Sequence, residues 1–304
     1  MISLRYHVVT IVGIFLALAI GLLGGGAFVQ PALQEELQDR TDAAESRAAE
    51  LRADIDDLRA QLGGLSGFVE ASVPYLTDGT LIGTRVVIVT QAEVGDDVLA
   101  ETQSALAEAG GEVITTVSAT GQFVSDDPTT QTELATLLGA PTAPAEELPT
   151  MAAQALAEGL SPSPTVIGGA VLDDLLSAGF LAPVGSGPSE AALDEIGATG
   201  QVVVVLSGGQ GEEPTLAPEA FAVPLVQRLA ELDVPVVAGE SLLSDYPYVS
   251  LLRADGIDGV VTVDDLDQTM GGAALVLGLD TLIETGEGGA YGVKDGAEPL
   301  PPLP

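Results

Sequence analysis

The strongest constraint on the fold is an uncharged run from Val8 to Val29, VVTIVGIFLALAIGLLGGGAFV. A helix crosses a bilayer with roughly 20 apolar residues, so this run is long enough to span a membrane. Arg5 precedes the run, and acidic residues follow it from Glu35 onward. Because the basic flank of a membrane helix stays in the cytoplasm, we expect residues 1–7 inside, one transmembrane helix over residues 8–29, and the rest of the chain outside.

A cleaved signal peptide is the alternative to a retained anchor. The small residues Gly25, Gly26 and Ala27 would suit a cleavage site. The apolar run is longer than the roughly 7 to 15 residues of a signal-peptide core, and its positively charged flank is thin. The sequence therefore favours a retained anchor.

Small residues recur every four positions within the same run, at Ala17, Gly21 and Gly25. This spacing places them on one helix face, where a second helix can approach closely. We interpret the three residues as a helix-dimerisation face. The alternative is that they reflect only the high frequency of glycine and alanine in membrane helices.

A seven-residue repeat follows the anchor over residues 30–65. Its apolar positions alternate steps of four and three, and the strongest of them are Leu51, Ile55, Leu58 and Leu62. A seam of this kind over about four heptads predicts a coiled coil, which Gly63-Gly64 would end. The alternative is an amphipathic helix that docks on its own domain. Together with the small-residue face, the seam favours a parallel homodimer or a higher homo-oligomer.

The pattern changes beyond residue 83 to buried strands that alternate with amphipathic helices. Strands are expected over residues 84–90, 112–118, 201–206, 234–238 and 259–263. Helices are expected over residues 97–109, 147–160, 170–178, 218–231 and 267–284. Repeated strand–helix–strand units predict an α/β fold with a mainly parallel sheet and flanking helices. We place a connector at residues 66–83, the exported domain at 84–290 and a flexible tail at 291–304.

The composition argues against several classes of function. The chain has 45 Asp and Glu against 9 Lys and Arg, with Lys294 as its only lysine. Nucleic acid and anionic headgroups carry the same sign as this surface, so they are poor partners for it. The chain has no cysteine, and His7 is its only histidine. The exported domain therefore has no cysteine nucleophile, no imidazole base to activate a serine and no zinc triad, and we expect no enzyme, no cofactor and no metal site.

A glycine-rich loop, residues 207–211 (SGGQG), follows one of the predicted strands. Its backbone amides could bind an anion. The loop lacks the lysine of a P-loop and the full dinucleotide spacing, and Glu212 and Glu213 come next. We interpret it as a surface turn.

Pairs of aspartates occur at Asp96-Asp97, Asp126-Asp127, Asp173-Asp174 and Asp264-Asp265. None of them matches a calcium-binding loop. Each lies where a helix could begin or continue, so helix capping or a solvated face explains them. Asp264, Asp265 and Asp267 are the first residues to test for a bound cation.

The order of these parts resembles the mycobacterial copper transport protein B (MctB) family of actinobacterial envelope proteins. The matching strings are MISLRYH before the apolar helix, RVVIVT followed by EAGGEVITTVS, VVVVLSGG, and TVDDLD leading to GGAYGVKDGA. The resemblance spans nearly the whole chain. It implies an outer-envelope membrane protein of copper homeostasis with channel-like copper efflux, and it assigns no site residues.

Copper chemistry limits what this resemblance implies. Copper prefers Cys, Met and His ligands, and beyond the anchor the chain offers only Met151 and Met270. One membrane helix encloses no pore, so conduction would need an oligomer. The other hypothesis is a dimeric coiled-coil scaffold that regulates a cell-wall or cell-separation partner in the envelope.

Overall fold

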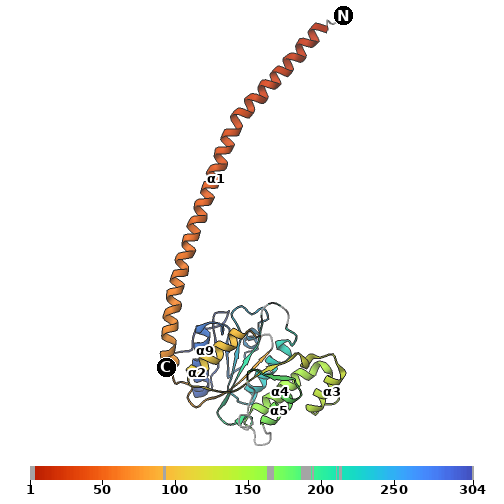
Figure 1. Ribbon diagram of the computed structural model, residues 1–304, viewed down its shortest axis with the longest axis vertical. Helices are drawn as coiled ribbons and strands as arrows, with labels where there is room; N and C mark the ends of the chain where they lie inside the picture. Colours follow the sequence, from red (N-terminus) through yellow and green to blue (C-terminus); the bar gives the residue numbers. More distant parts are fainter. Residues whose placement is uncertain are drawn as a thin grey trace. The chain divides into compact units, whose positions relative to one another are not determined.

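The computed structural model describes residues 4–91, 94–162, 168–185, 193, 195–209, 211 and 214–302. The chain divides into two compact units, Met1–Gly67 and Phe68–Pro304. The first unit belongs to one long helix, and the second is an α/β domain (Figure 1).

Helix α1 runs from Leu4 to Thr77 and contains the expected apolar helix. Its segment Tyr6–Leu23 has a mean hydropathy of 2.3, and none of it is buried. By length and composition this segment can cross a membrane. Ala17 and Gly21 are exposed on it, whereas the surroundings of Gly25 lie outside the described part of the chain.

The predicted helix break at Gly63-Gly64 is wrong, because α1 continues to Thr77. A Cβ added at either glycine would meet nothing within 4 Å. A glycine costs about 1 kcal/mol relative to alanine inside a helix, but it keeps its backbone hydrogen bonds, so two of them do not end a long helix. The predicted connector is therefore helical up to Thr77, and the turns into the domain begin at Asp78.

The last turns of α1 belong to the second unit and pack against it. Thr77 is buried, and Val73 and Thr77 line one hollow together with Ala105 and Ala273 of two domain helices. This packing concerns residues beyond the predicted seam, so the coiled coil and the docked helix stay alternatives for residues 30–65.

One sheet of seven strands forms the second unit, in the order β3-β2-β1-β4-β5-β6-β7. The strands are β1 Arg85–Gln91, β2 Glu112–Ala119, β3 Leu181–Pro183, β4 Gln201–Leu206, β5 Val236–Gly239, β6 Val260–Val263 and β7 Gly289–Tyr291. All neighbouring pairs are parallel except β2 with β3. The predicted α/β class with a mainly parallel sheet is confirmed.

Helices cover both faces of this sheet (Figure 1). They are α2 Asp96–Glu108, α3 Pro128–Leu137, α4 Leu148–Leu160, α5 Gly168–Ser177, α7 Ala222–Glu231, α8 Val249–Asp255 and α9 Thr269–Thr285, with short 3₁₀ helices η1 Gly121–Val124, η2 Ala145–Glu147 and η3 Pro218–Ala220. One core cluster joins the sheet to α2 and α9, and the other joins it to α4, α5, α7 and α8. Val86 and Ile88 of β1 enter the first cluster, while Val87 and Val89 enter the second. A strand buried on both faces needs a continuous apolar sequence, and β1 has one.

The predicted strands and helices are present, with ends that differ by a few residues. The sequence pattern did not predict α3, α8, β3 or β7. Strands β3 and β7 have three residues each, which is too short for a periodic pattern. Helix α8 has only seven residues and ends at Gly256, whose φ of 63° is left-handed.

Part of the tail that is expected over residues 291–304 contacts the sheet. The Gly292 N–H donates to Glu298 O, and the Glu298 N–H donates to Ala290 O, both at 2.8 Å. Tyr291 is buried. The chain after β7 therefore folds back along that strand and satisfies part of its open edge, which a sheet would otherwise leave unpaired.

Candidate functional site

Polar side chains gather at the edge of the sheet where the parallel strands end. Gln91 ends β1, and Ser207, Glu240 and Asp264 directly follow β4, β5 and β6. All four residues are at most 4% exposed. In α/β proteins this edge binds ligands, above all where the strand order reverses. Here the reversal lies between β1 and β4.

Two ion pairs neutralise the buried carboxylates at this edge. Arg253 Nη1 of α8 lies 2.6 Å from Asp264 Oδ2, and Lys294 Nζ of the tail lies 2.8 Å from Glu240 Oε1. Both carboxylates are fully buried. A buried charge without a partner is strongly destabilising, so Arg253 and Lys294 are needed to stabilise the two buried carboxylates.

Backbone N–H groups occupy the other oxygen of each carboxylate. Glu240 Oε2 accepts hydrogen bonds from Tyr248 N at 2.7 Å and Val249 N at 3.2 Å, at the start of α8. Asp264 Oδ1 accepts hydrogen bonds from Val293 N at 2.8 Å and Lys294 N at 3.1 Å. Every oxygen of the two carboxylates already has a partner, so they tie α8 and the tail to the sheet rather than offering ligands to a metal.

The aspartate pairs divide into exposed residues and buried ones. Asp127 confirms helix capping, because its Oδ2 accepts a hydrogen bond from Thr130 N at 3.1 Å, and this bond lowers its pKa. Asp173 and Asp174 lie exposed on α5. For Asp264 the expected cap or solvated face is wrong. Only the folded chain brings Arg253 and the tail to the end of β6, so the local sequence carries no sign of this role.

Asp265 is a third buried carboxylate at this edge of the sheet. It is 2% exposed, and its Oδ1 has no hydrogen-bond partner among the described residues. Burial, followed by the nearby charges of Asp264 and Asp267, raises the pKa of Asp265 to about 6. Asp267 Oδ1 instead accepts a hydrogen bond from Leu242 N at 2.7 Å. No group of three or more His, Cys, Asp or Glu within the described ranges is placed to hold a metal ion.

The glycine-rich loop lies at the reversal of strand order, in the place of a phosphate-binding loop. A hollow of about 200 Å³ is lined there by Ser207, Gly208 and the start of α2, including Asp97. The Ser207 hydroxyl donates to Gln91 Oε1, and the Asp97 carboxylate opposes an anion. These contacts support the interpretation as a turn. Residues 210, 212 and 213, which belong to the same prediction, lie outside the described residues.

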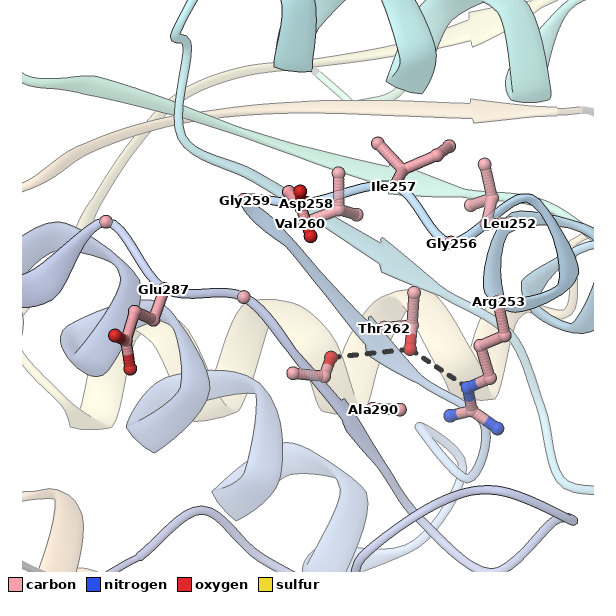
Figure 2. A pocket seen from close by; sticks show the side chains of 13 residues that line it. Leu252, Arg253, Gly256, Ile257, Asp258, Gly259, Val260, Thr262, Glu287 and Ala290 are labelled. Atoms are coloured by element: carbon pink, nitrogen blue, oxygen red, sulfur yellow. Dashed lines mark hydrogen bonds between the residues drawn. The ribbon is translucent and has the colours of Figure 1, made fainter.

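A larger groove of about 570 Å³ lies beside α8 and is called here the α8–β7 groove (Figure 2). Its lining is residues 252–253, 256–260, 262 and 286–290. Arg253 Nε donates to Thr262 Oγ1 at 3.0 Å, and Thr262 Oγ1 donates to Gly289 O at 3.4 Å. The volume is in the range of small-molecule and peptide sites, roughly 300–1,000 Å³.

The soft ligands that copper prefers are not brought together in the folded domain. Met151 lies on α4 and Met270 on α9, and these helices pack on opposite faces of the sheet. His7 belongs to the other unit of the chain. Within the described residues, the geometry therefore favours no copper chelation by soft side chains.

The predicted coiled-coil seam is exposed along α1. Leu51, Ile55, Leu58 and Leu62 are between 45% and 62% exposed. Large apolar side chains in a line on an isolated helix lose contact with water only when another surface covers them. The coiled coil and the homodimer stay predictions.

Comparisons with known proteins agree with the resemblance of the sequence. A family model described as "Copper transport outer membrane protein, MctB" matches residues 1–302. The proteins named "Copper transporter MctB" of Mycobacterium tuberculosis (strain ATCC 25618 / H37Rv) and Mycobacterium bovis are 28% identical over 98% of this chain and 98% of their own. The protein of the same name from Mycobacterium leprae is 27% identical, with the same coverage of both chains. These relatives are named as transporters and not as enzymes.

Proposed function

We propose, because the chain belongs to the MctB family of copper transport outer membrane proteins, that it serves copper transport or copper homeostasis in the cell envelope. The observation that carries this proposal is the family match over residues 1–302, which includes the anchor, the long helix and the α/β domain. The named copper transporters align with this chain over the sequence of all three parts.

In this proposal the segment Tyr6–Leu23 anchors the chain in a membrane. Residues 1–7 stay in the cytoplasm, because Arg5 is the only firmly basic residue beside the span and acidic residues follow it. The α/β domain then lies outside, at the end of the long helix. An acidic, hydrated surface is compatible with that location.

Transport by this chain would require several copies. One helix cannot enclose a path for an ion, because every polar group in the hydrocarbon region must be satisfied within the protein. Ala17, Gly21 and Gly25 would let anchors pack closely, and the exposed seam of α1 would hold the copies together. Copper would pass without being held by Met151 or Met270.

Purified full-length chain in liposomes tests this proposal. Copper added outside should reach a copper-sensitive dye trapped inside faster than in protein-free liposomes. A variant with Met151→Leu and Met270→Leu should transport at the same rate, because the two sulfurs lie on opposite faces of the sheet. Equal rates with and without protein would contradict copper transport, and a slow methionine variant would contradict transport without soft ligands.

The alternative proposal is a dimeric scaffold that regulates a cell-wall or cell-separation partner. The exposed seam at Leu51, Ile55, Leu58 and Leu62 favours it. A parallel pair of helices would bury this seam and hold two α/β domains at one end. This arrangement offers a surface for contact and needs no chemistry in the domain.

Lysine substitutions in the seam test the dimer shared by both proposals. Leu51→Lys with Leu58→Lys puts two charges into the seam and should convert dimers into monomers, measured by light scattering of the full chain in detergent. The matched control is Ala53→Lys with Ala60→Lys, which adds the same charges two positions away from each seam residue. The control should stay dimeric. Dimers that persist in the seam variant would contradict the coiled coil.

A further inference from the structure

The α8–β7 groove lies on one face of the sheet, between the end of α8, strand β6 and the segment that leads into β7. Val260 of β6 enters the core cluster that contains α8, whereas Tyr291 of β7 enters the cluster on the opposite face. Because neighbouring residues of a strand alternate in direction, Ala290 faces the same side as Val260. The chain after β7 turns into the tail, so Ala290 is partly exposed and forms the floor of the groove, next to the buried Val260.

The groove carries negative charge at its rim. Arg253 and Glu287 stand at opposite ends of the lining, with Asp258 between them in the view of Figure 2. The Arg253 guanidinium is neutralised by Asp264 and also donates to Tyr291 O at 2.9 Å. Asp258 and Glu287 are exposed, and their carboxylates have no cationic partner within the described residues. An occupant that brings positive charge would therefore be attracted.

The walls of the groove are rich in glycine, which exposes main-chain groups instead of side chains. Glycines occupy positions 256, 259, 286, 288 and 289 of the lining. Bare main chain in the walls and small apolar side chains on the floor suit an extended peptide, which can form main-chain hydrogen bonds and place short side chains inward. Its basic side chains would then reach the acidic rim.

The occupant cannot come from the same α/β domain, because the basic residues of that domain are already paired. Arg85 pairs with Glu195, Arg228 with Glu158 and Glu231, Arg253 with Asp264, and Lys294 with Glu240. The arginines at positions 5, 40, 47, 52 and 59 belong to helix α1, so none of them lies in an extended segment.

From these observations we infer that the α8–β7 groove binds an extended basic peptide segment of a separate protein. This inference does not depend on copper transport. In this inference the carboxylates of Asp258 and Glu287 bind the basic side chains of the peptide, and its small side chains contact the floor at Ala290.

Binding of a fluorescent peptide of alternating alanine and lysine to the full chain in an uncharged detergent tests the inference. Salt near 0.15 M limits long-range attraction to the strongly acidic surface. Binding should be saturable, and Asp258→Asn with Glu287→Gln should weaken it about tenfold, as expected for two partly exposed ion pairs. The matched control, Asp173→Asn with Asp174→Asn, removes two exposed charges on α5 and should change affinity by less than about twofold.

A second variant tests the shape of the groove independently of its charge. Ala290→Phe fills the floor without changing the net charge and should abolish binding, with circular dichroism used to check the fold. If Ala290→Phe does not fold, the rim variant alone decides. Unsaturable binding, equal weakening by the α5 control, or equal affinity for spermidine would overturn the inference, because each indicates attraction of any cation rather than recognition of a peptide.

Discussion

Replacing Arg253 with methionine should lower the free energy of unfolding of the α/β domain by about 3–5 kcal/mol. Methionine keeps much of the bulk of the side chain but leaves Asp264 fully buried without its cation. The hydrogen bonds from Arg253 to Thr262 and to Tyr291 O are lost as well. Urea unfolding followed by tyrosine fluorescence measures the loss, since Tyr248 is fully buried in the same domain.

The control for this prediction is Arg228→Met. Arg228 also forms two short ion pairs, but its partners Glu158 and Glu231 are 49% and 64% exposed. Exposed ion pairs contribute at most about 1 kcal/mol, so this variant should be close to the wild type. Equal losses in the two variants would contradict a special role for the buried network.

A double variant separates the two causes of the lost stability, which are the unpaired charge of Asp264 and the missing hydrogen bonds of Arg253. Asp264→Leu in the Arg253→Met background removes the unpaired charge and should restore part of the lost stability. The recovery should be incomplete, because the N–H groups of Val293 and Lys294 then lose their acceptor. A double variant less stable than Arg253→Met would contradict the charge as the main cause.

Replacing Asp265 with asparagine should have the opposite effect and stabilise the domain at neutral pH by up to about 3 kcal/mol. The carboxylate is 2% exposed, has one oxygen without a hydrogen bond among the described residues, and lies between Asp264 and Asp267. Asparagine has nearly the same shape but no charge to desolvate. The size follows from a difference of about two pKa units at 1.36 kcal/mol per unit.

The effect of Asp265 depends on pH in a defined direction. Its pKa is about 6 in the folded chain and 3.8 without burial. Between these values the folded protein binds more protons than the unfolded one, so stability falls as pH rises and stays lower above pH 6. The Asp265→Asn variant lacks this loss. Its free energy of unfolding should equal that of the wild type near pH 4 and should exceed it by the full difference at pH 7.

Urea unfolding at several pH values checks this prediction. Asp173→Asn is the matched control, because Asp173 is exposed on α5, and its effect should stay within about 0.5 kcal/mol at every pH. Charged groups packed around Asp265 are Asp264, Asp267 and Arg253. A stability difference between Asp265→Asn and wild type that does not grow with pH would contradict the buried, proton-binding carboxylate.

Several elements follow from local sequence alone because their cause is local. The run from Val8 to Val29 has no charged residue, so it forms an apolar helix. The strings RVVIVT and QVVVVL are apolar at every core position, so they form central strands buried on both faces. Asp127 caps α3 through a residue three positions away, an interaction that the sequence spacing predicts.

Other features depend on contacts between distant residues, and local patterns predicted them wrongly or not at all. Gly63 and Gly64 weaken a helix, but the helix continues to Thr77, and its last turns pack on the domain. The tail is rich in Gly and Pro, yet Lys294 holds it to the sheet through Glu240, more than fifty residues earlier.

The uncharged run, the heptad repeat and the continuous apolar strands by themselves determined an apolar helix, a long amphipathic helix and a mainly parallel sheet, since hydrophobic periodicity is a property of neighbouring residues. Only the tertiary structure decided the roles of Glu240, Arg253, Asp264 and Asp265. Burial determines how strongly each of these charges stabilises or destabilises the fold. Burial in turn depends on which distant segments meet at the carboxyl edge of the sheet.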